Sequence, residues 1–181
     1  MKRICLPVLL ILCLLLSACS SAAEGKFRAF SEDLAARDSL HFKAKLRAEY
    51  PDRTLDFTLD YALQDGEQRV TVLEPESIRG VRARLLPGET RLEYEGLLLD
   101  APALGCAELS PMSALPLLVE TLRRGHLDSH WQEGGALAVQ LILTDELRAT
   151  VRFEPESMRP VSAELFCADR LVIACEITDW R

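Results

Sequence analysis

The chain has 181 residues, of which 28 are acidic and 21 are basic, so its formal net charge is −7 at neutral pH. An acidic protein is repelled by nucleic acid and by anionic lipid, which argues against either as the main partner. No charge run or low-complexity stretch indicates a second domain.

The first nineteen residues resemble the secretion signal of a bacterial lipoprotein. Two basic residues are followed by an apolar stretch over 4–16, which is too short to span a bilayer that needs about 20 helical residues. The stretch ends in Leu-Ser-Ala-Cys at 16–19, where a signal peptidase would cut before the Cys and a diacylglycerol would be attached to its sulfur. The alternative is an ordinary secretory signal that is cut nearby. We predict a signal peptide over 1–18, lipid attachment at Cys19 and a linker over 19–26.

This anchor predicts the location of the protein. Two acyl chains on Cys19 would hold it stably to a bilayer, so the partner implied first is the membrane itself. The protein would then be lipid-anchored to the extracytoplasmic face of the cell membrane, or to an outer membrane if the host has two. The folded domain over 27–181 would lie close to the membrane surface.

Three of the six cysteines, Cys106, Cys167 and Cys175, remain after such processing. Export would permit a disulfide, but three thiols cannot all pair and none falls in a CxxC spacing. Matched strand faces place Cys167 opposite Leu171, so a bridge from Cys167 to Cys175 would need backbone distortion. We interpret Cys167 and Cys175 as small core residues.

After the anchor, the apolar period changes from helical to alternating. Residues 24–38 predict an amphipathic helix with Phe27, Phe30 and Leu34 on one face. From Leu40 onward, apolar and polar residues alternate, which predicts half-buried strands joined by hairpins. Residues 126–135, which end in two glycines, are expected to form a loop.

The register of each hairpin follows from making apolar faces coincide, because a slip of one residue turns a whole face outward. In the first hairpin, Tyr50 would pair with Leu55 and Leu46 with Leu59. A turn at Asp65-Gly66 sets Leu59 opposite Val72 in the second. The same reasoning gives these further pairs: Ala83 with Tyr94, Leu165 with Ile173, and Ala163 with Cys175.

A second helix is predicted over residues 110–124, with one apolar side and a stop at Gly125. Pro116 fits this helix best if Ser113 is the N-cap, because proline is tolerated in the first turn.

The segment Glu-Pro-Glu-Ser occurs at 74–77 and again at 154–157, an offset of 80 residues. The flanking hairpins align with it, which indicates an internal repeat of about 54–97 and about 137–178. The glutamates could be cation ligands, but hard-metal sites usually add Asp, Asn and Gly, which are missing here. We favour a turn between two strands.

The order of elements, with the segment Pro75–Val81 and the helix entry Leu109-Ser110-Pro111, resembles the superfamily of LolA-like and LolB-like lipoprotein carriers and receptors. Within that superfamily the chain most resembles the small clostridial lipoproteins, which include a germination lipoprotein. The resemblance implies a mainly β fold with α (α+β): a strongly curved antiparallel sheet, or incomplete barrel, of about 8–10 strands. An N-terminal helix and a mid-chain helix would close its hollow side.

In the carriers of that superfamily the hollow receives acyl chains, and the strand faces of this chain are compatible with such a hollow. The candidate apolar cleft is lined by Phe42, Leu46, Phe57, Leu59, Tyr61 and Tyr94. The alternative is that these side chains are core residues packed against the two helices. The basic residue and mobile helices that carriers use have no counterpart that we can assign to positions in this chain.

No catalytic motif, metal or cofactor is predicted. His126 and His130 have i, i+4 spacing, but Leu127 stands where a zinc-protease helix has Glu, and glycines flank the segment. Cys106 has no recognisable His or Asn context, and no GxSxG occurs. Trp131 is a candidate exposed contact for a partner or the membrane, although it could instead cover the core.

Two functions remain for a non-enzymatic, membrane-anchored lipoprotein. The first is binding of a lipidic or acyl ligand, or a protein segment, in the hollow of the curved sheet. The second is an accessory or scaffold role, in which the outer surface docks on a cell-envelope enzyme such as a peptidoglycan amidase in sporulation or germination. An open apolar cleft above a few hundred Å³ would favour the first, and a hollow filled by helix side chains the second.

Overall fold

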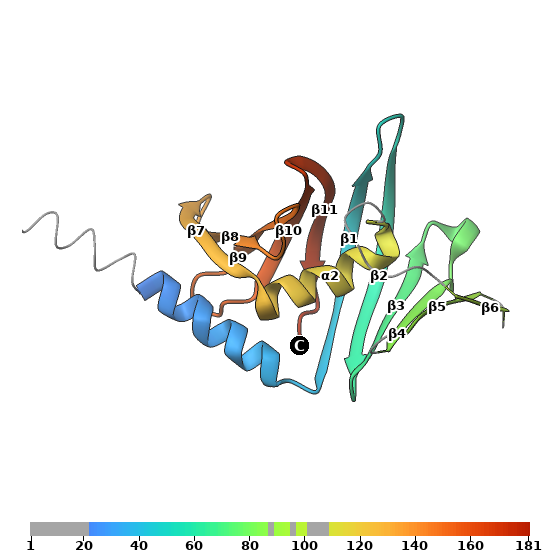
Figure 1. Ribbon diagram of the computed structural model, residues 1–181, viewed down its shortest axis with the longest axis horizontal. Helices are drawn as coiled ribbons and strands as arrows, with labels where there is room; N and C mark the ends of the chain where they lie inside the picture. The colour runs from blue at the N-terminus through green and yellow to red at the C-terminus, as the bar shows by residue number, and fades with distance from the viewer. Residues whose placement is uncertain (1–21, 87–88, 95–96, 101–108) are drawn as a thin grey trace, which may run out of the picture.

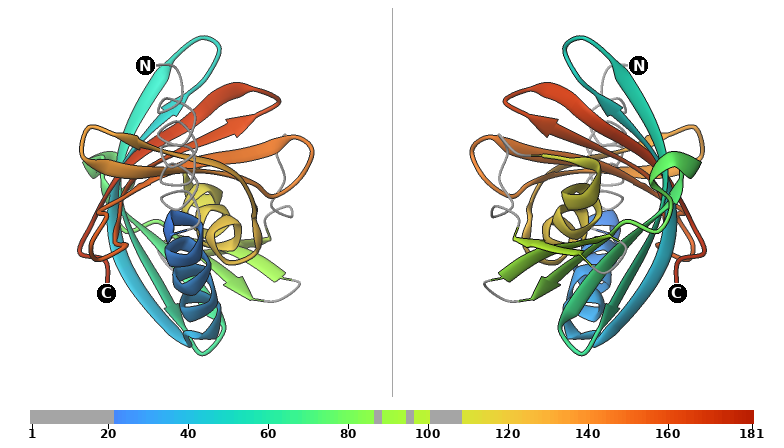
Figure 2. Two further views of the ribbon diagram at one scale, coloured as in Figure 1. Left: turned by 90° about the vertical axis from the view of Figure 1, so that its left-hand side faces the viewer. Right: turned by 90° about the vertical axis from the view of Figure 1, so that its right-hand side faces the viewer.

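The computed structural model describes residues 22–86, 89–94, 97–100 and 109–181, with side chains described outside 86–108. One antiparallel sheet of eleven strands curves around two helices (Figures 1 and 2). No helix in these described ranges is long and apolar enough to span a membrane. The fold class expected from the sequence is confirmed.

The elements follow a simple order along the chain. The helices are α1 (22–36), the short 3₁₀ helix η1 (Glu76–Ile78) and α2 (Pro111–Arg124). The strands are β1 (Ser39–Glu49), β2 (Thr54–Gln64), β3 (Glu67–Glu74), β4 (Arg82–Leu86), β5 (Glu89–Tyr94), β6 (Leu97–Asp100), β7 (His126–Glu133), β8 (Ala136–Ile142), β9 (Leu147–Phe153), β10 (Pro160–Cys167) and β11 (Arg170–Thr178).

The sheet order is β6-β5-β4-β3-β2-β1-β11-β10-β9-β8-β7, so the first and last strands of the chain pair in its middle. β6 and β7 are its two edges, and the sheet does not close. The count exceeds the eight to ten strands expected, since the four-residue β6 and the eight-residue β7 add the two edge strands. The expectation that 126–135 forms a loop is wrong, because 126–133 pairs with β8 from His126 opposite Ile142 to Glu133 opposite Ala136.

Helix α1 packs on the sheet through the apolar face expected from its periodicity. Phe27 and Leu34 are buried and Phe30 is half-buried. The rings of Phe30 and Phe153 meet edge to face with centroids 5.1 Å apart, a geometry that aromatic pairs prefer. These contacts fix α1 across the strands of the second half of the chain, which Figure 1 shows behind it.

Helix α2 begins one turn earlier than Pro116 suggested. Ser110, not Ser113, is the N-cap, and the two serines cap each other: the Ser113 amide donates to Ser110 Oγ and the Ser110 amide donates to Ser113 Oγ at 2.9 Å. Pro111 occupies the first helical position, which favours proline. Pro116 therefore lies inside the helix, where its missing amide leaves one helical hydrogen bond unmade.

The first and third hairpins differ from expectation by two residues. Leu46 lies opposite Phe57 rather than Leu59. The reason is that the Tyr50 amide donates to the Arg53 carbonyl, so Tyr50 faces Arg53 across the turn and not Leu55 as expected. Ala83 lies opposite Leu92 rather than Tyr94. A shift of two keeps every side chain on the same face, so the apolar pattern cannot detect it.

The second hairpin and the last one have the expected pairs. Leu59 is opposite Val72, with Asp65 and Gly66 both at positive φ in the turn between them. In the last hairpin, Leu165 is opposite Ile173 and Ala163 is opposite Cys175.

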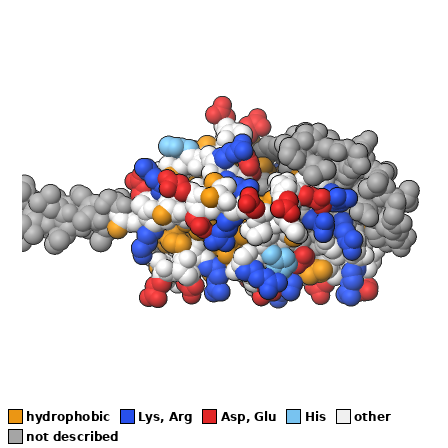
Figure 3. Space-filling view, turned by 90° about the horizontal axis from the view of Figure 1, so that it is seen from below, with side chains coloured by type: hydrophobic (Ala, Val, Ile, Leu, Met, Phe, Trp, Pro, Cys, Tyr) orange, Lys and Arg blue, Asp and Glu red, His pale blue; other side chains and the backbone are white. Residues whose placement is uncertain are grey.

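The two Glu-Pro-Glu-Ser segments both join one strand to the next. Between β3 and β4 the segment forms η1, in which Arg79 pairs with Glu76 at 2.5 Å. Between β9 and β10 it forms a turn, in which the Ser157 hydroxyl donates to Glu154 at 2.6 Å. These carboxylates are used within their turns, as the turn interpretation expected. Elsewhere on the surface, basic and acidic side chains are interspersed (Figure 3).

Candidate functional site

The hollow side of the sheet holds most of the predicted cleft residues. Phe42, Leu46, Leu59 and Tyr61 are at most 1% exposed and belong to one continuous core. The ring of Phe42 stacks on that of Tyr61 with centroids 4.8 Å apart. Phe57 is half-buried at the margin of that core, and the side chain of Tyr94 lies outside the described residues.

Helix α2 occupies this hollow. Ten of its side chains are buried, and they lie around the whole helix rather than on one face: Pro111, Ser113, Ala114, Leu115, Pro116, Leu117, Leu118, Val119, Thr121 and Leu122. A helix with buried side chains all round is enclosed by protein over most of its length, and the charged residues of α2, Glu120, Arg123 and Arg124, lie toward its C-terminal end. Its buried Thr121 hydroxyl is satisfied within the helix by the Leu117 carbonyl at 2.8 Å.

A second buried polar group beside α2 is the phenol of Tyr61. Its hydroxyl donates to Gln68 Oε1 at 2.9 Å, which satisfies a group that would be costly to bury alone. Burial raises the pKa of Tyr61 well above its usual value. The phenol therefore stays neutral, and it serves the core as a hydrogen-bonded packing residue.

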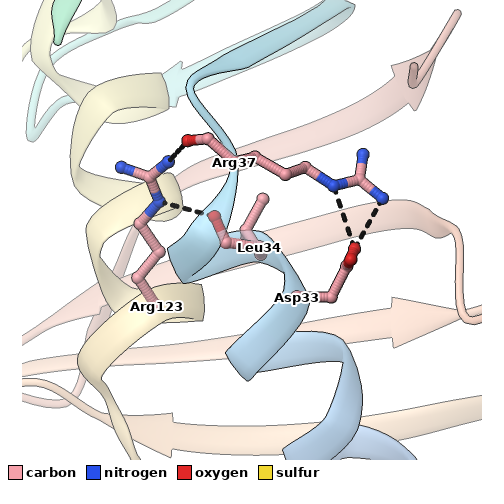
Figure 4. A network of polar contacts seen from close by, with 4 residues as sticks. All are labelled: Asp33, Leu34, Arg37 and Arg123. Atoms are coloured by element: carbon pink, nitrogen blue, oxygen red, sulfur yellow. Dashed lines mark hydrogen bonds and ion pairs between the residues drawn. The ribbon is translucent and has the colours of Figure 1, made fainter.

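The C-terminal ends of α1 and α2 cap each other (Figure 4). The Arg123 guanidinium of α2 donates to the Leu34 carbonyl at 3.2 Å and to the Arg37 carbonyl at 3.0 Å. In return, the Ser31 hydroxyl of α1 donates to the Leu122 carbonyl at 2.8 Å. Terminal helix carbonyls have no partner within their own helix. These bonds therefore fasten the two helices together over the hollow.

An open groove lies on the opposite, outer face of the sheet. Its volume is about 870 Å³, and it crosses β2, β1, β11 and β10, with η1 and Arg152 of β9 also lining it. The residues that point into it alternate with the buried ones along each strand. Its lining includes the small residues Thr58, Ser162 and Ala174.

Charged side chains of both signs surround this groove. Arg47 bonds Asp56 at 2.8 Å, and this hydrogen bond lowers the pKa of the Asp56 carboxyl. Arg152 reaches Glu133 at 2.8 Å and Glu164 at 3.3 Å. The groove could not be predicted from the sequence, because alternation identifies an outer face of a strand without showing where that face is hollowed. The one feature of the sequence that points to the groove is the presence of small residues at outward positions of neighbouring strands.

His126 and His130, which were expected in a loop, lie on strand β7, and no further metal ligands among the described residues gather around them. Within the described ranges, no group of three or more His, Cys, Asp or Glu side chains could hold a metal ion. His41, for which the sequence suggests no role, pairs with Asp60 at 2.9 Å on the outer face.

The cysteines differ from the interpretation as two core residues. Cys167 is disulfide-bonded, and since Cys175 is free, its partner lies outside the described residues. The bridge from Cys167 to Cys175 that the hairpin register argued against does not form, and a bulge between Leu165 and Phe166 places Cys167 opposite Arg170 rather than Leu171. Cys175 is a buried core residue, as expected, and burial raises the pKa of its thiol to about 12.

Trp131 lies on β7 with 38% of its surface exposed, one of two large apolar side chains that are exposed among the described residues. It borders a hollow of about 420 Å³ beside the first turns of α1, with Ala22, Ala23 and Lys26. Cys19 lies outside the described residues, so its lipid attachment remains a prediction.

No protein-family model matches the sequence, and no curated protein is significantly similar to it. Among solved structures, a DUF1329 family protein from Desulfovibrio piger matches with 9% identity and a TM-score of 0.52, over 86% of this chain and 90% of that one. A LolA superfamily protein from Nitrosomonas europaea matches with 12% identity and a TM-score of 0.46, over 85% and 92%. The complex of the CwlD amidase with the GerS lipoprotein from Clostridioides difficile matches with 9% identity and a TM-score of 0.46, over 87% and 94%. The likeness to the first shows a shared fold.

Proposed function

We propose that this protein is a membrane-tethered, non-enzymatic lipoprotein that acts as an extracytoplasmic scaffold. In this proposal it binds a segment of a cell-envelope protein in the outer groove of its sheet. The observation that carries it is the burial of α2 in the hollow, where a carrier would need room for acyl chains. The outer groove is open and is the largest of the hollows described.

The groove suits a polypeptide better than an acyl chain. Arg47, Asp56, Glu164 and Glu176 give its walls both charge signs, which would pair with polar side chains and backbone groups of a partner. A hydrocarbon chain would cover these charges without replacing their hydrogen bonds to water, which is unfavourable.

Binding of an acyl ligand in the hollow is the second candidate, because the face of the sheet beneath α2 is apolar throughout. The ligand would have to displace part of α2 or α1. Displacement would break the bonds of Arg123 and Ser31 that fasten the helix ends. The two candidates therefore differ in whether the helices move.

Photo-crosslinking in the host bacterium tests the scaffold directly. A photoreactive phenylalanine replaces Glu176, which lines the groove, and a matched variant carries it at Glu32, an exposed position of α1. The proposal expects a discrete protein adduct from position 176 that is absent from position 32. Charge reversal at the neighbouring groove position, Lys45→Glu, should weaken the adduct. Adducts with lipid alone from position 176, or equal protein adducts from both, would contradict the proposal.

A further inference from the structure

The start of α1 and the β7–β8 hairpin lie at the same end of the molecule (Figure 1). Ala22 and Lys26 of α1 share a hollow with Trp131 and Gln132 of β7. Lys26 is fastened there, because its ammonium group donates to the Pro155 carbonyl at 3.2 Å. The first described turn of the protein and its exposed tryptophan are therefore neighbours.

This end is held close to the predicted anchor. Ala22 follows Cys19 by three residues, and three residues of extended chain span at most about 11 Å. A diacylglycerol on Cys19 would lie in the outer leaflet, so Ala22 cannot be more than that distance from the headgroup region. Trp131, across the shared hollow, is brought to the same depth.

The side chain of Trp131 suits that depth. Indole has an apolar body and one hydrogen-bond donor, and tryptophan is enriched where membrane and water meet. In the register, Trp131 lies opposite Ala138 of β8, which is fully buried, so the neighbouring strand is packed at this point. A tryptophan 38% exposed on an edge strand is thus presented outward by a fixed support.

The acidic side chains nearest this end are paired. Glu133 pairs with Arg152 at 2.8 Å, and at the start of α1 Glu24 pairs with Arg28 at 3.1 Å. The Lys26 ammonium is bonded to a backbone carbonyl, so its positive charge stays at this end and no acidic side chain named here would repel a lipid headgroup.

We propose that Trp131 is a membrane contact that inserts at the bilayer interface beside the lipid anchor and fixes the orientation of the domain. This inference rests on the proposed tether at Cys19. Two acyl chains alone would leave the domain free to rotate about a short linker, and a third contact on β7 removes that freedom. The outer groove would then have one fixed direction relative to the membrane.

The test uses the full-length protein purified from its membrane and reconstituted in phosphatidylcholine vesicles. A Trp180→Phe background leaves Trp131 as the one tryptophan. We expect a blue shift of its emission on reconstitution and a loss of intensity when the lipid tails carry bromine. If Trp180→Phe fails to fold, the difference between the parent protein and Trp131→Phe gives the same signal.

The matched control moves the indole to the other exposed apolar position. Ile78 is 36% exposed on η1, far from the start of α1, so Ile78→Trp in a background without Trp131 and Trp180 should show neither effect. Intact mass on the same sample reports acylation. An acylated protein whose Trp131 emission is unchanged overturns this inference alone, whereas an unacylated protein overturns the tether and this inference together.

Discussion

The Ser31 hydroxyl of α1 donates a hydrogen bond to the Leu122 carbonyl of α2, with 2.8 Å between the oxygens. Together with the two bonds that Arg123 returns to α1, it joins the ends of two helices that lie over the hollow of the sheet. The helices are therefore fastened to each other as well as packed on the strands. This arrangement explains why the hollow is closed in the structure described.

Replacing Arg123 by methionine should lower the free energy of unfolding by about 1–3 kcal/mol, because the Leu34 and Arg37 carbonyls lose their partner. Methionine keeps much of the apolar stem, so packing changes little. The matched control is Arg124→Met. The Arg124 side chain is 76% exposed and pairs with Glu120, so this change should cost about 0.5 kcal/mol or less. Urea unfolding monitored by circular dichroism measures both. Equal losses of unfolding free energy in the two variants would show that the hydrogen bonds between the helix ends do not stabilise the fold.

Two glycines should respond to alanine with opposite signs. A Cβ at Gly125 would lie 2.4 Å from the Thr121 carbonyl oxygen and 3.3 Å from Leu141 Cβ, so Gly125→Ala should destabilise by about 1–3 kcal/mol. Gly25, within α1, has nothing within 4 Å, so Gly25→Ala should stabilise by up to about 1 kcal/mol through helix propensity. Thermal unfolding of the two variants checks the order, and a stabilised Gly125→Ala protein would refute the close packing at the end of α2.

Glu67 should make the free energy of unfolding fall in acid. Hydrogen bonds from Arg84 and Arg69 lower the pKa of its carboxyl to about 2, whereas in the unfolded chain the pKa of that carboxyl is about 4.3. Its stabilisation is therefore complete above about pH 5 and is lost as the pH falls toward 2. Since both arginines are substantially exposed, we expect about 1 kcal/mol or less. Glu67→Gln should flatten the decline of unfolding free energy between pH 5 and pH 2.5, and an unchanged slope would contradict the assignment.

The cysteines should behave as three distinct groups. The buried Cys175 thiol, with its pKa raised to about 12, should not react with Ellman's reagent at pH 8 until the protein unfolds. If the signal is cleaved before Cys19 and its sulfur is acylated, as we propose, Cys106 is the remaining cysteine for the disulfide of Cys167. Peptide mapping without reductant should then find Cys106 linked to Cys167 and one free thiol per unfolded chain. Two or more free thiols would contradict this.

The sequence predicts the strands and both helices because apolar period and turn chemistry are local. The Asp65-Gly66 turn fixed one register correctly, whereas the loop near Tyr50 could close at either of two pairs that leave the same face buried. The strand over 126–133 was missed because an edge strand needs few buried side chains to form. The position of α2 inside the hollow depends on the curvature of the whole sheet, which no local pattern carries.

The candidate site was less accessible to sequence reasoning than the fold. Phe42 and Tyr61 were assigned to the correct face, but whether such a face lines a cleft or a packed core depends on what covers it. The one sequence signal was the distribution of apolar residues around α2, since Leu115, Leu117 and Val119 do not fall on a single side of a helix.

Native mass spectrometry of residues 20–181, exported by the host behind an ordinary cleavable secretion signal and purified without detergent, tests the central claim most directly. That claim is that the hollow is filled by the protein's own helices and that binding takes place on the outer face. We predict the mass of the processed polypeptide, alone or with a bound protein, and without lipid. A stoichiometric complex with one lipid molecule that dissociates only when the protein unfolds would contradict the account.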